Sequence, residues 1–292
     1  MKKNPNVSII IRTRNEEEWL RHTLLSVQKQ NYSDYEIIIV DNNSNDLTLK
    51  ICKFFKIKKI VKLKNYLPGK SINSGVKRAS GKIIVLLSAH CVPTNKNWLK
   101  YLIKPLSTKD IVAVYGRQSP TATSNNSDIR DLFITFGLDQ KLQSKDPFFH
   151  NANSSIKKEI LDKIPFDESL TNIEDRDWGK KIIKKGFKIF YEPLANVYHY
   201  HGIHHSNSEE RVLSTVNVLK KIENINLNNF IPKSKKFENL NFVITIICPN
   251  NFDSKKHINP IKKSIKFFTG IFENQKMIIF KSRDLPLKID NL

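Results

Sequence analysis

The chain has 292 residues, with 49 Lys and Arg against 28 Asp and Glu, which gives a formal net charge of +21 at pH 7. Its hydrophobic fraction of 39% is higher than a disordered chain carries, so the composition excludes a wholly disordered protein. Length and composition together predict one large folded domain with room for a small appendage.

The excess of basic residues has three interpretations: nucleic-acid binding, contact with an anionic membrane surface or lipid phosphate, or lysines that are merely solvated. No nucleic-acid motif accompanies the charge, and Lys greatly outnumbers Arg, which is the residue that reads bases. We therefore expect no nucleic-acid partner. Peripheral membrane contact and solvated lysines both stay open.

Cysteine usage and hydropathy indicate the compartment. Cys52, Cys91 and Cys248 are far apart and odd in number, so neither a disulfide framework nor a structural zinc site is expected. The apolar run at residues 7–11 is too short for a signal peptide or a membrane span, and no stretch of about 18 apolar residues occurs elsewhere. We expect a cytoplasmic protein, with any membrane contact peripheral and at the inner face.

Short apolar runs alternate with helical patterns in the first third of the chain. The predicted strands cover 7–11, 36–40, 59–63 and 82–87, and the predicted helices cover 16–30, 48–55 and 70–79. Near-continuous apolar strands that alternate with helices are typical of a mainly parallel sheet with helices on both faces. The predicted fold class is therefore α/β.

The rest of the chain is less regular. Residues 111–117, 187–191 and 196–200 have strand patterns, whereas 128–141, 156–164 and a segment from Glu174 to about Lys185 have helical ones, the last stopped by Gly186. A helix at 208–224, a polar linker at 226–241, and strands at 242–248 and 276–281 around a helix at 260–268 follow. We predict a domain at 1–205, a helix and linker at 206–241, and an extension of unknown role at 242–292.

Polar residues follow the predicted strands, where parallel sheets bind ligands. They lie at 12–16, 41–44 and 88–90. The Asp41 carboxylate is placed to accept hydrogen bonds from a nucleotide base or ribose, although capping of the next helix explains an acid there equally well. Gly69-Lys70-Ser71 lacks the upstream glycine of a phosphate-binding loop, since position 64 is Lys64. Proximity of Lys70 to a phosphate stays a hypothesis.

Two further groups of residues carry titratable chemistry. Glu174 and Asp175 open a helix beside Trp178, where a carboxylate acts either as a general base or as a favourable partner of the helix dipole. His90, and the pair His199 and His201 on one face of a strand, are candidate metal ligands. The alternative for the histidines is an ordinary polar loop.

Taken in order, these segments resemble the family 2 glycosyltransferases with a GT-A fold, of the kind that builds bacterial surface polysaccharides. The resemblance covers about residues 5–205. It rests on six matches: VSIIIRTRNE at 7–16, YEIIIVDNNSND at 35–46 against the family's VDNxSxD, GKSINSG at 69–75 against GxxxNxG, GKIIVLL at 81–87, the Glu-Asp of NIED at 172–175, and VYH at 197–199.

The resemblance implies a role for each matching residue. Asp175, with Glu174, is the catalytic base of an inverting transfer, and a divalent cation, Mn²⁺ or Mg²⁺, stabilises the leaving diphosphate. The residues implied in donor binding are Thr13, Asn15, Glu16, Asp41, Lys70, Asn73 and Ser88. The implied partners are a nucleotide-sugar donor and a glycan or lipid-linked acceptor.

The sequence departs from the family at one point. The family's Asp-x-Asp is replaced by Ser88-Ala89-His90, so the implied metal ligands are His90 and His199, and imidazole suits softer ions than Mg²⁺. Loss of the aspartates keeps open a catalytically impaired nucleotide-sugar-binding or scaffold protein of the same fold. A nucleotidyltransferase is less favoured, because its glycine- and arginine-rich N-terminal loop is missing.

Overall fold

The computed structural model describes residues 4–201, helical pieces at 214–215, 217–219 and 222, and strands at 242–248, 275–281 and 286–287. The chain forms two compact units, Met1–Asn224 and Ile225–Leu292. Within the described part, no helix is long and apolar enough to cross a bilayer.

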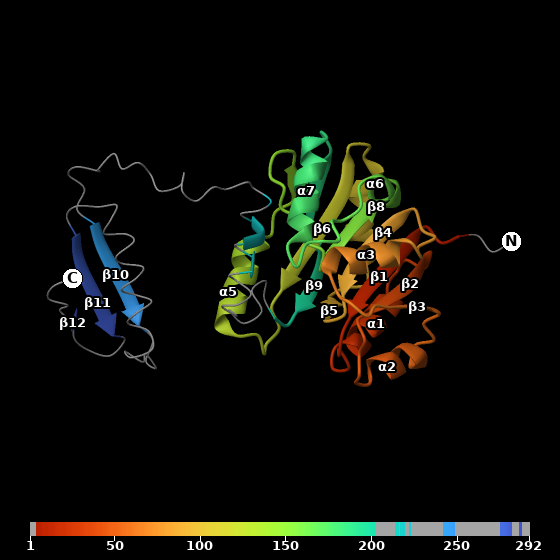
Figure 1. Ribbon diagram of the computed structural model, residues 1–292, viewed down its shortest axis with the longest axis horizontal. Helices are drawn as coiled ribbons and strands as arrows, with labels where there is room; N and C mark the ends of the chain where they lie inside the picture. Colours follow the sequence, from red (N-terminus) through yellow and green to blue (C-terminus); the bar gives the residue numbers. More distant parts are fainter. Residues whose placement is uncertain are drawn as a thin grey trace. The chain divides into compact units, whose positions relative to one another are not determined.

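The first unit is built on one sheet whose strands follow the order β3-β2-β1-β4-β8-β6-β9-β5, with β7 paired to β9 (Figure 1). The strands are β1 (Val7–Thr13), β2 (Tyr35–Asp41), β3 (Lys59–Lys62), β4 (Ile83–Ser88), β5 (Cys91–Pro93), β6 (Ile111–Ser119), β7 (Lys141–Gln143), β8 (Asn153–Lys157) and β9 (Lys188–His199). The helices are α1 (Leu20–Gln28), α2 (Thr48–Phe54), α3 (Pro68–Val76), α4 (Trp98–Ile103), α5 (Asn126–Thr135), α6 (Lys158–Lys163) and α7 (Glu174–Lys184), with a 3₁₀ turn at Lys104–Ser107.

The predicted parallel sheet is confirmed for its first half, and the second half is mixed. β3, β2, β1 and β4 run parallel, whereas β8 lies antiparallel to both β4 and β6. β6 and β9 are again parallel to each other. Consequently the carboxyl ends of β1, β2, β4, β6 and β9 all lie at one edge of the sheet, which is the edge expected to bind ligand.

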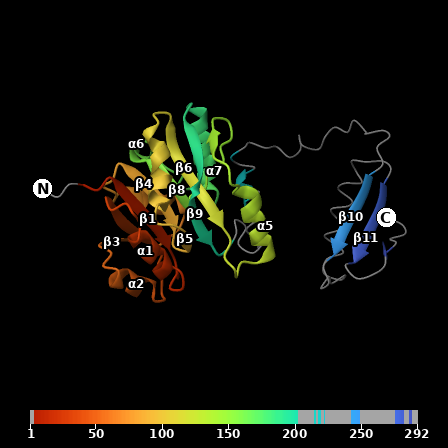
Figure 2. The ribbon, with the colours of Figure 1, turned by 180° about the vertical axis from the view of Figure 1, so that it is seen from behind.

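Helices cover both faces, as predicted, because alternate strand residues point to opposite sides. Ile9 and Ile11 of β1 belong to a core cluster with residues of α1, α2 and α4, and Ile10 belongs to a second cluster with residues of α3, α5, α6 and α7. Figure 2 shows the same sheet and helices from behind. The two clusters hold the sheet between layers of helices and so fix the ends of its strands.

Three segments differ from expectation. The predicted helix at 128–141 ends at Thr135, and β7 follows it. The two strands predicted at 187–191 and 196–200 form one strand, β9, because it continues past Pro193 through an irregularity in its pairing with β6. The polar stretch before the predicted helix at 156–164 is the buried strand β8, and that helix is the shorter α6.

The second unit contains β10 (Phe242–Cys248), β11 (Gln275–Lys281) and β12 (Pro286–Leu287). β10 and β11 pair in parallel, and β12 pairs antiparallel to β11. The predicted strands at 242–248 and 276–281 are confirmed. The predicted helix at 260–268, the linker at 226–241 and most of the helix predicted at 208–224 lie outside the described residues.

Candidate active site

The loops after β1 and β2 are joined by hydrogen bonds of Asn15, one of the residues expected to hold the nucleotide. The Asn15 amide group accepts a hydrogen bond from the backbone N–H of Asn45, and the N–H of Asn15 donates to the Ser44 hydroxyl, both at 2.9 Å. Asn15 and Asn43 both have positive φ, which asparagine tolerates better than most residues. The two loops therefore form one connected rim at the ligand edge.

Asp41 is buried inside this rim. Its carboxylate accepts hydrogen bonds from the Ser44 hydroxyl at 2.5 Å and the Ser44 N–H at 3.2 Å. Asp46, rather than Asp41, accepts from the N–H of Thr48 at the start of α2. The helix-capping alternative for Asp41 is therefore wrong, and its carboxylate instead closes a local turn below the rim.

Thr13 and Ser88 lie beside these residues on the sheet. Thr13 pairs in register with Asp41, and Arg12 pairs with Ser88. Among the described residues, the Thr13 hydroxyl is one of several buried side-chain groups without a hydrogen-bond partner.

The two residues of α3 that are expected to bind the donor differ in burial and in their contacts. Lys70 is half-buried in the first turn of the helix. Asn73 is buried, and its amide donates to the Phe166 carbonyl at 2.9 Å and to Glu168 at 3.0 Å, while its oxygen accepts from the Phe166 N–H. Asn73 therefore holds the segment at 166–168 against α3.

The carboxylates at the start of α7 lie beside a buried cation. Arg12, at the end of β1, has its guanidinium 3.6 Å from the Glu174 carboxylate. Asn151 donates from its side chain to Glu174 at 3.1 Å and from its backbone to Asp175 at 3.2 Å. These contacts bring the end of β1, the start of α7 and the segment just before β8 together in one polar site.

Burial raises the pKa of both carboxyls. For Glu174, desolvation and the neighbouring Asp175 raise the pKa, while Arg12 and Asn151 oppose the rise. For Asp175, desolvation raises the pKa, while backbone N–H groups of Asn151 and Arg176, and Arg12, oppose it. A carboxylate with a raised pKa that remains partly exposed is a suitable general base.

The packing of α7 fixes the position of these carboxylates. Trp178 is fully buried, donates from its indole to the Ile164 carbonyl at 2.8 Å, and packs against Phe149 and Phe166 with ring centroids 5.3 Å away. Gly179 lies so close to Pro147 that an added Cβ would lie 2.2 Å from the carbonyl oxygen. Ile173, just before the helix, has φ 48°, which is strained for a β-branched residue.

The three histidines named as candidate metal ligands come together. His90, His199 and His201 place one ligand atom each within 4.8 Å of one another. Glu16, which is expected at the nucleotide, contacts His90, with its carboxylate oxygen 2.6 Å from Nδ1. The imidazole nitrogens would suit a divalent transition ion at this edge.

Sequence reasoning missed several of these residues. Arg12 and Asn151, which contact the two carboxylates, were not assigned a role, and neither was Gln118, whose side-chain oxygen lies 2.7 Å from His199 Nδ1. Gln118 follows the predicted strand at 111–117, so the rule that polar residues after strands line the site would have found it. No such signal marked Asn151, because β8 was not recognised as a strand.

Comparison with known proteins identifies the family. The model of "Glycosyl transferase family 2" matches residues 8–165, which is more than half of the chain. The chain belongs to glycosyltransferase family 2. This family 2 match spans β1 to α6 and so includes the rim, Arg12 and His90.

Related proteins agree with this assignment. Glycosyltransferase AglE of Haloferax volcanii is 25% identical over 64% of this chain and 64% of its own length, and the O-antigen chain rhamnosyltransferase WbaN of Salmonella anatum is 25% identical over 68% and 67%. The chain thus spans about two thirds of the length of the curated relatives it matches.

A solved structure confirms the fold. A mannosyltransferase from Pyrobaculum calidifontis, in complex with GDP-Man and Mn²⁺, superposes with a TM-score of 0.57 at 19% identity, covering 75% of this chain and 65% of that one. The predicted GT-A fold is confirmed.

Proposed function

We propose that this chain is an inverting glycosyltransferase that moves a sugar from a nucleotide-sugar donor to a hydroxyl of a glycan or lipid-linked acceptor. The observation that carries the proposal is the site at the start of α7, where Asp175 has a raised pKa and lies beside Glu174 and Arg12. The solved relative with GDP-Man and the O-antigen rhamnosyltransferase support the class of donor and product.

In the proposed reaction, the Asp175 carboxylate takes the proton of the acceptor hydroxyl. The acceptor oxygen forms a bond to the anomeric carbon as the bond from that carbon to the diphosphate breaks on the opposite side, which inverts the configuration. The nucleoside diphosphate leaves with the electron pair. The N–H groups of Asn151 and Arg176, together with Arg12, favour the ionised form of Asp175 and so oppose the desolvation that raises its pKa.

The donor would bind along the rim. The Thr13 hydroxyl and Asp41 lie next to each other for the base and ribose, Asn15 holds the two loops in register, and Lys70 in the first turn of α3 is suited to a phosphate. Asn73 would act by fixing the segment at 166–168. A divalent cation held by His90 and His199 would offset the charge of the leaving diphosphate.

Substitution of Asp175 by Asn tests the base. We expect Asp175→Asn to lower kcat by about 10²- to 10⁴-fold while the affinity for the nucleoside diphosphate stays near that of the wild type. Asp177→Asn is the matched control, because Asp177 is another acid in the first turn of α7 whose carboxylate pairs with Lys181. Turnover of Asp175→Asn at the wild-type rate would exclude Asp175 as the base.

The competing hypothesis is a catalytically impaired nucleotide-sugar-binding protein, and it draws on the replacement of Asp-x-Asp by Ser88-Ala89-His90. The two are separated by incubation with the correct donor and a mixture of acceptor glycans. Release of nucleoside diphosphate that depends on Asp175 supports the transferase. Tight donor binding with no release of nucleoside diphosphate, either by transfer or by slow hydrolysis of the donor, would support the impaired protein.

A further inference from the structure

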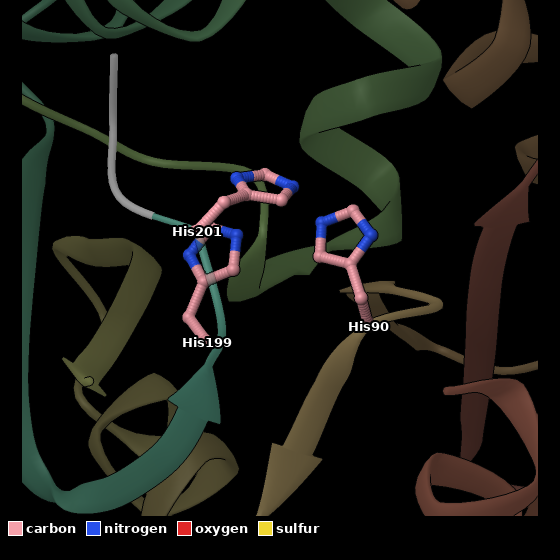
Figure 3. Close-up of side chains that lie close together, drawn as sticks. All are labelled: His90, His199 and His201. Carbon is pink, nitrogen blue, oxygen red and sulfur yellow. The ribbon is translucent and has the colours of Figure 1, made fainter. Parts of the chain in front are cut away.

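Three imidazoles lie together where β4 and β9 end (Figure 3). The ring centroids of His90 and His201 are 4.3 Å apart, those of His199 and His201 are 4.5 Å apart, and those of His90 and His199 are 5.1 Å apart. His199 and His201 are buried and His90 is half-buried.

Two side chains fix which nitrogen of the rings carries the proton. The Glu16 carboxylate, 2.6 Å from His90 Nδ1, is an acceptor, so His90 donates from Nδ1 and Nε2 is the nitrogen left for a metal ion. Gln118 places its oxygen 2.7 Å from His199 Nδ1 and its NH₂ group 3.0 Å from His150 Nδ1. This orientation of the amide gives His199 the same tautomer as His90.

We propose that His90, His199 and His201 bind a transition ion of the Zn²⁺ and Co²⁺ class in preference to Mg²⁺, with Glu16 and Gln118 as positioning residues. Imidazole nitrogens suit Zn²⁺, Co²⁺ and Ni²⁺, whereas Mg²⁺ takes oxygen ligands and keeps its waters. A carboxylate behind a ligating histidine is the usual support of a zinc-type site. Glu16 is thereby assigned to the metal rather than to the nucleotide.

The site also leaves room for an anionic ligand. Three neutral nitrogens compensate none of the charge of a divalent ion, and catalytic zinc sites combine three protein ligands with one open position. A diphosphate oxygen is a suitable fourth ligand. This last step rests on the proposed transferase function, whereas the ion preference rests on the histidines and their two supporting side chains alone.

Cobalt provides a direct readout of the ligands. Co²⁺ is titrated into the full-length, metal-free chain without nucleotide, and visible absorption is followed, with Zn²⁺ and Mg²⁺ as competitors. We expect one Co²⁺ per chain at this site, displaced by equimolar Zn²⁺ and unaffected by Mg²⁺ at about 100-fold excess. Displacement by equimolar Mg²⁺ would overturn the proposal.

Variants locate the bound ion. His90→Ala and His199→Ala should each weaken Co²⁺ binding by at least about tenfold, and His22→Ala, an exposed histidine on α1 outside the cluster, should not. A melting temperature close to that of the wild type shows that each variant is folded. Folded His90→Ala and His199→Ala variants with unchanged Co²⁺ affinity and spectrum would overturn the assignment of ligands.

The role of Glu16 is tested separately. Glu16→Ala should weaken Co²⁺ affinity about 10- to 100-fold, and Glu16→Gln, which keeps an acceptor oxygen for His90 Nδ1, should recover most of that loss. A purely structural role of Glu16 would change the melting temperature and leave the cobalt spectrum as it is. Unchanged affinity in a folded Glu16→Ala variant would remove Glu16 from the site.

A double variant tests the ion preference. Ser88→Asp with His90→Asp puts carboxylates where the family pattern has them, and we expect Mg²⁺ and Mn²⁺ then to compete with Co²⁺. The proposed function and this inference can fail independently. A chain that binds Zn²⁺ here but never transfers sugar contradicts the function alone, whereas Asp175-dependent transfer by a chain that binds no ion at the histidines contradicts this inference alone.

Discussion

Arg12, Glu174 and Asp175 lie together at the end of β1, with Glu174 buried and the other two half-buried, and their mutual effects help to determine when Asp175 is ionised. Desolvation raises the pKa of Asp175, and Arg12 lowers it in part. A general base works in its ionised form, so activity is lost as the pH falls through the raised pKa. We expect the acid side of the kcat profile to have its midpoint above about 4, the ordinary value for aspartate.

Removal of the cation sharpens this prediction. In Arg12→Gln, the favourable charge beside Asp175 is gone, so its pKa should rise further and the acid midpoint of kcat should move to higher pH. The measurement is a kcat profile of both proteins over the same buffers, with circular dichroism to show that the variant is folded. A midpoint that stays in place or moves to lower pH would contradict the electrostatic role given to Arg12.

The sequence predicted where single site residues lie better than it predicted what they contact. The positions of Asp41, Asn73 and Glu16 at the ligand edge follow from strand ends and motif matches. The partners of Asn73 and Glu16 do not, because the segment at 166–168 and His90 come from parts of the chain distant in sequence. The partner of Asp41 is local, since Ser44 lies three residues further along the chain. His90 and His199 were predicted as metal ligands by the same reasoning. They are more than a hundred residues apart in sequence, so that separation alone does not show that they lie close together in the fold.

At the scale of elements, α3 shows what the glycines of the GKSINSG segment do. An added Cβ at Gly75 would lie 2.7 Å from Ile10 Cγ2 and 3.1 Å from Val40 Cγ2, both core residues of the sheet. At Gly69 it would lie 2.1 Å from the Asp167 carbonyl oxygen. The segment is therefore a packing surface that brings Lys70 and Asn73 close to the sheet.

Gly75→Ala should destabilise the fold by about 1–3 kcal/mol, because an extra methyl must displace β1 and β2 side chains. Gly137→Ala is the matched control, since a Cβ there meets nothing within 4 Å, and it should change stability by less than about 1 kcal/mol. The free energy of unfolding of both variants in urea provides the comparison. Equal stabilities would show that α3 packs less tightly than described.

One element that escaped prediction, β8, did so for a physical reason. β8 carries Asn153 and Ser155, whose polar groups are buried because Trp98 donates to Asn153 at 2.9 Å and Ser155 donates to the Leu102 carbonyl at 2.7 Å. Apolar periodicity cannot detect a strand whose polar residues are satisfied by distant partners. The strands with continuous apolar runs, β1, β2 and β4, were predicted within two residues of their bounds.

The whole molecule carries a net charge of +21, for which peripheral contact with an anionic membrane and merely solvated lysines are the two open explanations. The membrane explanation makes a prediction that vesicle flotation tests. Full-length protein should co-float with vesicles that contain anionic lipid at low ionic strength and be released as salt shortens the screening length to about 3 Å at 1 M. Vesicles of purely zwitterionic lipid are the control. Equal binding to both kinds of vesicle, or binding that resists salt, would contradict an electrostatic mechanism.

The central claim, transfer from a nucleotide-sugar donor, is tested most directly by calorimetric titration of UDP, GDP, CDP and dTDP into the full-length chain, with and without a divalent ion. We predict saturable binding of one of these nucleotides at one site per chain, strengthened by the ion. If none of the four binds under either condition, the account of the β1 and β2 rim as a donor site is wrong.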